Sequence, residues 1–235
     1  MSKLYEALQQ SEPGRSQPRR DRLIPAMPQL AMDSRQSMEA LYQSLENALP
    51  GIARKVVLFS ASRAGEGTTT IVREFAVALS HVFKASVLVV DANPNRSAAH
   101  AFGDVEVFPL SELLRSLQAS DAKRAKQAGI TVAIFEPEVT NGRAKQLEAS
   151  AGIGDALREH FDYVLFDAPA LGSSATAVSL AHYVDGVVIV IDSERTRWPV
   201  VENTRKTYES TGAKVLGVVL NKRAFHVPQW LYKWL

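Results

Sequence analysis

Six short segments of the chain consist almost entirely of apolar residues, many of them β-branched. Such nearly continuous apolar segments are typical of parallel strands that are buried on both faces of a sheet. Apolar residues at helical spacing fill most of the intervals between them. This alternation of strand and helix predicts an α/β fold, a doubly wound and mostly parallel sheet. The strands are expected at 55–60, 86–92, 131–135, 163–168, 186–192 and 214–221, and the helices at 69–81, 110–117, 153–160, 175–182 and 199–211.

The same pattern divides the chain into three parts. Residues 1–36 are interpreted as a short helix at 1–10 and a flexible basic arm, because residues 11–30 carry five prolines or glycines and four arginines. The arm is either a solvated tether or a contact for acidic lipid headgroups or nucleic acid. A domain at 37–223 follows and begins with a helix over 37–49. The tail, 224–235, carries Trp230, Tyr232 and Trp234, and either packs on the domain or docks at a membrane interface or on a partner.

Composition narrows the function. The chain has no cysteine, which excludes disulfides and thiolate metal sites. The formal charge of +2 gives no reason to expect nucleic acid as a partner. No window approaches the ~18–20 apolar residues of a membrane span. We therefore expect a cytoplasmic protein whose membrane role, if any, is peripheral.

The first predicted strand ends in SASRAGEGTTT, residues 60–70. Glycines here permit tight turns, and the backbone N–H groups can converge on phosphate oxygens at the start of the next helix. The hydroxyl of Thr69 occupies the position that binds Mg²⁺ in phosphate-binding loops. The standard motif, GxxxxGK[ST], has a lysine where this chain has Thr68. Taken alone, the segment also fits a Gly/Ser turn with no ligand.

Two aspartates follow other predicted strands, Asp91 in VLVVDAN and Asp167 in YVLFDAPA. Ligands of doubly wound sheets bind at the carboxyl ends of the strands, where such carboxylates can hold Mg²⁺. A single aspartate at a strand end is more often a helix cap or a turn residue. The loop and both aspartates together, in this order, predict a nucleotide site.

These motifs, with VDGVVIVID and VLGVVLNKR, resemble the bacterial tyrosine autokinases (BY-kinases) of capsule and exopolysaccharide production. That family lies within the MinD/ParA-type, deviant-Walker branch of the P-loop ATPases. The resemblance implies that Asp91 and Asp167 are catalytic, and that Asp91, Asp167 and Thr69 hold Mg²⁺ with ATP. It further implies a nucleotide-binding set of Arg63, Ala64, Gly65, Glu66, Gly67, Thr68, Thr69, Thr70, Asn221 and Arg223.

The chain also departs from the pattern of these kinases. The departures remove charge, a proline or a phosphorylatable tyrosine, and together they imply attenuated or lost kinase activity. They are Thr68 for lysine, Asn93 for aspartate, Ala170 for proline, Gln43 and Glu46 for two arginines of ring assembly, and a lone Tyr232 for a tyrosine cluster.

The absent lysine has a calculable effect. A charge-assisted contact to phosphate contributes roughly 1.5–3 kcal/mol to binding. Loss of one preorganised donor typically costs about 10²–10³ in rate. Arg63 falls where deviant-Walker ATPases place a second lysine, and is interpreted either as a partial substitute or as an exposed loop residue.

The resemblance implies a nucleotide-binding protein of exopolysaccharide synthesis or export, peripheral to the inner membrane. Its expected partner is an inner-membrane polysaccharide co-polymerase or chain-length protein, and self-association into a homo-oligomer is left open. The alternatives are a ParA/MinD-like positioning ATPase and a nucleotide-free scaffold.

Overall fold

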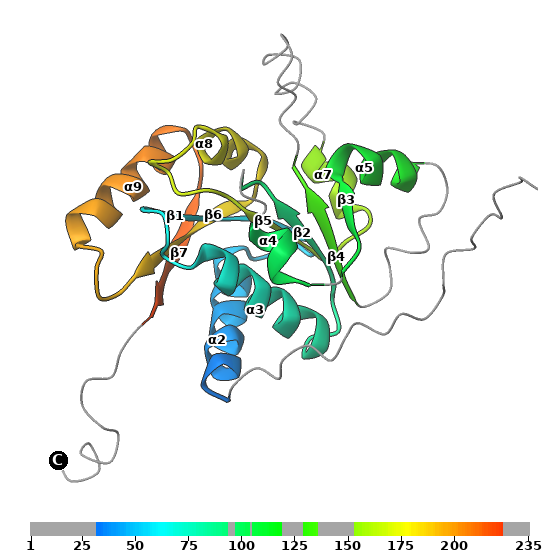
Figure 1. Ribbon diagram of the computed structural model, residues 1–235, viewed down its shortest axis with the longest axis horizontal. Coiled ribbons are helices and arrows are strands. Elements are labelled where there is room, and N and C mark those ends of the chain that lie inside the picture. The colour runs from blue at the N-terminus through cyan, green and yellow to red at the C-terminus, as the bar shows by residue number, and fades with distance from the viewer. Residues whose placement is uncertain (1–31, 94–96, 104, 119–128, 136–152, 223–235) are drawn as a thin grey trace, which may run out of the picture.

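The computed structural model describes residues 32–93, 97–103, 105–118, 129–135 and 153–222 (Figure 1). The expected helix at 1–10, most of the basic arm, Arg223 and the tail lie outside these ranges. None of the helices in the described part of the chain has the length and apolar character needed to span a membrane.

A seven-stranded sheet forms the centre of the fold, and every strand pairing in it is parallel. The predicted doubly wound α/β sheet is therefore confirmed. The strands lie in the order β3-β4-β2-β5-β1-β6-β7. Their bounds are β1 Lys55–Ala61, β2 Ser86–Asp91, β3 Val107–Pro109, β4 Gly129–Ile134, β5 Tyr163–Asp167, β6 Gly186–Asp192 and β7 Val215–Asn221.

Helices cover both faces of the sheet (Figure 1). One face carries α2 Met32–Ala48, α3 Thr68–His81 and α4 Ser97–Ala101. The other carries α5 Leu110–Gln118, α7 Ile153–Arg158, α8 Thr176–Leu180, a 3₁₀ turn at Ala181–Tyr183, and α9 Trp198–Ser210.

Two hydrophobic cores result, one on each side of the sheet. In β1, Val57 and Phe59 belong to the core beneath α2 and α3, whereas Val56 and Leu58 belong to the opposite core. All four side chains are fully buried. Successive side chains of a strand point to opposite faces, so a strand covered on both sides is apolar at nearly every position. The edge strand β7 differs, since Leu220 is 58% exposed.

A polar cluster joins α2 to the sheet. Lys55 is 3% exposed, and its Nζ lies 2.9 Å from Glu46 Oε2 and 2.6 Å from the carbonyl oxygen of Ile52. The hydroxyl of Tyr163 donates to the other Glu46 oxygen. Burial alone would raise the pKa of Glu46, but the hydrogen bonds from Tyr163 and Lys55 hold it below its ordinary value. Glu46, expected at an assembly surface, is thus engaged within its own domain.

Candidate nucleotide-binding site

The loop that the sequence predicts to bind phosphate, residues 62–67, connects β1 to α3 at a central position of the sheet. Gly65 and Gly67 adopt left-handed conformations, with φ of 83° and 92°. Gly67 is also closely approached, because a Cβ there would lie 2.1 Å from Asn221 Nδ2. As N-cap, Gly67 offers no side-chain acceptor to the first turn of α3. A helix N-terminus without a side-chain cap is a position where backbone N–H groups can bind an anion.

Contacts within the loop and from two other segments hold it in shape. Glu66 is 3% exposed, and its carboxylate accepts hydrogen bonds from the Arg63 N–H at 2.8 Å and from the hydroxyl of Thr196, in the segment between β6 and α9. From the end of β7, Asn221 Nδ2 donates to the Glu66 carbonyl oxygen at 2.9 Å. Lys222 Nζ donates to the carbonyl oxygen of Gly65 at 2.5 Å. The loop is thus tied to both β6 and β7.

Asp91 and Asp167 lie side by side at the ends of β2 and β5, where they are partners in the parallel register. Both are fully buried. The hydroxyl of Thr69 donates to Asp167 Oδ2 at 2.7 Å, and the Asn93 N–H donates to Asp91 Oδ1 at 3.0 Å. Asp167 Oδ1 is buried and has no hydrogen-bond partner among the residues that the structure describes.

This environment disfavours the charged form of Asp167. Burial, and to a lesser extent repulsion from Asp91, raise the pKa of Asp167 to about 7, against the opposing effect of the Thr69 hydrogen bond. A divalent cation would supply the charge and the partner that Oδ1 lacks. Nowhere in the described ranges do three or more acidic or histidine side chains form a metal cage. Such a sparse set fits Mg²⁺, which retains waters and uses substrate phosphates as ligands.

The structure brings most of the predicted residues to one edge of the sheet. Thr68 is the first residue of α3 and is 9% exposed, so a small buried hydroxyl stands where the resemblance implies a lysine. The side chains of Arg63 and Thr70 are exposed, as are Ala64 and Gly65. Arg223 lies outside the described residues.

Sequence reasoning did not assign three residues that shape the loop. Lys222 Nζ lies 3.4 Å from Asp192 Oδ2, which is buried at the end of β6, and Thr196 anchors Glu66. Asp192 ends an apolar strand as Asp91 and Asp167 do, and this signal could have identified it. Glu66, predicted as a nucleotide contact, has its carboxylate bonded to the Arg63 N–H and to Thr196, so it also holds the loop.

Sequence comparison relates the chain to bacterial tyrosine kinases. No protein-family model matches it. Over 183 residues the chain is 26% identical to the tyrosine-protein kinase CpsD of Streptococcus agalactiae serotype III, covering 73% of this chain and 76% of CpsD. It is 27% identical over 175 residues to the tyrosine-protein kinase YwqD of Bacillus subtilis, covering 71% and 72%. The succinoglycan biosynthesis transport protein ExoP of Rhizobium meliloti is 26% identical over 186 residues, which are 75% of this chain but 23% of ExoP.

Solved structures agree on the fold. The kinase domain of the Escherichia coli tyrosine kinase ETK superposes with a TM-score of 0.68 at 20% identity, covering 97% of this chain and 91% of that domain. The septum site-determining protein MinD of Pyrococcus horikoshii, complexed with Mg-ADP, gives 0.51 at 19% identity, covering 77% and 76%. The resemblance to tyrosine autokinases, and the P-loop fold that they share with MinD, are confirmed.

Proposed function

We propose that this chain, a homologue of the bacterial tyrosine-protein kinases, binds Mg·ATP and acts in exopolysaccharide or capsule production with attenuated or lost kinase activity. One observation carries the proposal. The Thr69 hydroxyl is hydrogen-bonded to the buried Asp167 at 2.7 Å, while the second oxygen of Asp167 lacks a partner in the described part of the chain. A hydroxyl and a carboxylate in this relation, beside an open helix terminus, suit the magnesium ion of a bound nucleotide.

The residues of the site have separate tasks. The N–H groups of the loop and of the first turn of α3 would bind phosphate oxygens. Thr69 and Asp167 would hold Mg²⁺, which would supply positive charge beside the phosphates. Asp91, buried beside Asp167, orients a tyrosine hydroxyl and accepts its proton. Thr68 supplies no charge to the transferred phosphoryl group. Binding is therefore weakened less than transfer.

The names of the relatives support the place of action that we propose. ExoP is named as a biosynthesis transport protein for succinoglycan, and the chain matches about a quarter of it. We propose that the present chain works beside a separate inner-membrane co-polymerase, at the cytoplasmic face, and regulates it through nucleotide occupancy. A nucleotide-free scaffold would not need the unpartnered carboxylate oxygen of Asp167.

Calorimetric titration with Mg·ATP tests the proposal. We expect weak binding by the wild type and binding about 10-fold or more tighter in Thr68→Lys, because the variant restores a charge-assisted contact to phosphate. Thr70→Lys is the matched control, since it adds the same charge one residue along, at an exposed position. Phosphotyrosine on the purified Thr68→Lys protein would show that the lysine alone restores kinase activity. No binding by either the wild type or Thr68→Lys would refute the proposal.

A further inference from the structure

We propose that Lys222 binds the nucleotide phosphates and takes over the charge that Thr68 cannot supply. This inference rests on the proposed function, since it names a residue of the same site. It assigns the compensating cation to the end of β7, more than 150 residues along the chain from the loop itself.

The contacts of Lys222 place its ammonium group on the loop. Nζ donates to the carbonyl oxygen of Gly65 at 2.5 Å and lies 3.4 Å from Asp192 Oδ2. A Cβ at Gly67, the N-cap of α3, would come within 3.9 Å of Lys222 Cε. The lysine therefore reaches across the loop that cradles the phosphates, from the side opposite to Asp91 and Asp167 in the strand order.

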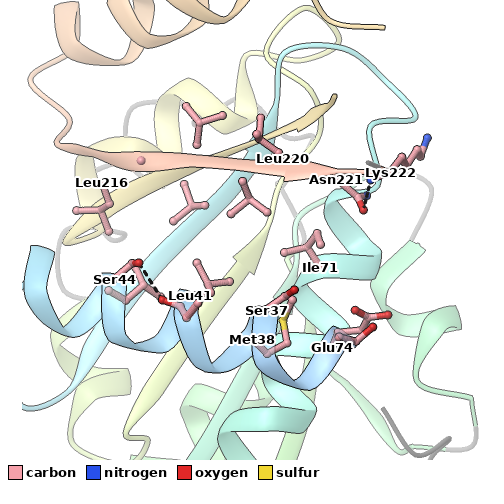
Figure 2. A pocket seen from close by; sticks show the side chains of 17 residues that line it. Ser37, Met38, Leu41, Ser44, Ile71, Glu74, Leu216, Leu220, Asn221 and Lys222 are labelled. Carbon is pink, nitrogen blue, oxygen red and sulfur yellow. Dashed lines mark hydrogen bonds between the residues drawn. The ribbon is translucent and has the colours of Figure 1, made fainter. Parts of the chain in front are cut away.

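The backbone of Lys222 is also specifically arranged. Its φ of 57° lies in the left-handed region, which residues other than glycine adopt uncommonly and at some energetic cost. Asn221 stabilises this turn, because its Oδ1 accepts a hydrogen bond from the Lys222 N–H at 2.8 Å. Figure 2 shows the pair at the end of β7. Asn221 thereby holds the loop with its Nδ2 and aims Lys222 with its Oδ1.

The present partners of Lys222 leave its charge available. Its side chain is 46% exposed, and its ion pair with Asp192 is long. The Asp192 side chain is only 7% exposed, but a long pair whose cation faces solvent holds that cation less firmly than a short, fully buried pair. A phosphate carries more charge than Asp192, and its oxygens accept stronger hydrogen bonds than a carbonyl. Nucleotide binding therefore draws the ammonium group from the Gly65 carbonyl and Asp192 to the phosphates.

The test is a double-mutant cycle, read by calorimetric titration with Mg·ADP. Lys222→Met removes the charge and keeps most of the stem. We expect it to weaken binding about 10-fold to 150-fold, the loss of one charge-assisted hydrogen bond. In a Thr68→Lys background the same change should weaken binding less than about 3-fold, because the restored lysine takes over the phosphates. Lys222→Arg should retain most of the affinity.

Lys214→Met is the matched control. Lys214 is an exposed lysine just before the other end of β7, where it donates to the Ala48 carbonyl at 2.7 Å. Removing it changes the net charge equally, and we expect wild-type affinity. Thermal unfolding of each free variant shows whether its fold is intact.

The outcomes separate the two proposals. Wild-type affinity in Lys222→Met, or an equal loss with and without Thr68→Lys, overturns the role of Lys222 and leaves the proposed function standing. Binding by Thr68→Lys but not by the wild type overturns both proposals, since the wild-type chain then does not bind the nucleotide. If neither protein binds Mg·ADP, the proposed function fails, and the inference fails with it.

Discussion

Glu46→Gln should destabilise the folded protein by removing the charge that balances a buried lysine. In the wild type, Lys55 Nζ has Glu46 Oε2 at 2.9 Å and the Ile52 carbonyl oxygen at 2.6 Å. Glutamine has nearly the shape of glutamate and still accepts a hydrogen bond from Lys55 or from the Tyr163 hydroxyl. It carries no charge, so the ammonium group of Lys55, 3% exposed, loses its counter-ion.

The size of the effect follows from the burial of the two partners. Removing one member of a fully buried ion pair typically costs about 3–5 kcal/mol. The side chain of Glu46 is 32% exposed, so water compensates part of the loss, and we expect about 2–3 kcal/mol. For a domain of this size that loss lowers the melting temperature by about 4–12 °C.

The dependence on pH has a definite sign. The pKa of Glu46 is held below its ordinary value of 4.5. A carboxyl group with a lowered pKa stabilises the fold above its unfolded pKa and loses that contribution as the pH falls through the folded pKa. The difference between wild type and Glu46→Gln should therefore be full at pH 7 and shrink below pH 4.5.

Urea unfolding at pH 7 and at acidic pH provides the measurement. Glu39→Gln is the matched control, because it breaks the Arg35–Glu39 pair, of similar length at 3.0 Å but with side chains 59% and 43% exposed. Its expected cost is below about 0.5 kcal/mol. The reasoning is refuted if Glu46→Gln costs no more than Glu39→Gln, or costs as much in a Lys55→Met background as in the wild type.

Two further variants test the site. Asp167→Asn keeps an acceptor for Thr69 and removes the carboxylate. The rise in the pKa of Asp167 from 3.8 to about 7 corresponds to a loss of roughly 4 kcal/mol in the free energy of unfolding above pH 7. The Asp167 carboxyl ionises near pH 4 in the unfolded chain and near pH 7 in the folded protein. As the pH rises from about 4 to about 7, the wild type therefore loses stability through this group, and Asp167→Asn does not. Thermal scans should therefore show that the free Asp167→Asn protein is more stable than the free wild type above pH 7. Mg·ADP should not raise the melting temperature of this variant. Equal melting temperatures of the two free proteins at pH 8 would contradict the first expectation. Gly67→Ala places a Cβ 2.1 Å from Asn221 Nδ2 at a φ of 92°. It should cost about 1–3 kcal/mol and abolish nucleotide binding, as measured by calorimetry, and wild-type affinity would show that the loop tolerates a side chain there.

The strands were predictable where a single rule governed every position. Strands covered by helices on both faces are apolar at nearly every position, so β1, β2, β5 and β6 appear in the sequence as nearly continuous apolar segments. The three-residue β3 and the five-residue α4 are too short for a period to emerge. Both were absent from the sequence prediction.

The backbone of the site was predictable for a similar reason. Gly65, Gly67, Thr69 and the strand-end aspartates occupy positions that chain geometry alone assigns. The side chains that hold the loop could not be predicted, because their partners are distant in sequence. Glu66 and Thr196 are 130 residues apart, and only the completed sheet brings β6 and β7 beside the loop.

The buried carboxylate of Glu66 has a consequence for the entropy of ligand binding. Its bonds to the Arg63 N–H and to Thr196, with the bond from Asn221 to its carbonyl oxygen, give the loop its shape before any ligand arrives. Ordering a backbone residue costs roughly 1–2 kcal/mol, and here that cost belongs to folding. Under the proposed function, an anion entering the loop would therefore find the backbone already ordered, which would offset part of the affinity lost with Thr68 in place of a lysine.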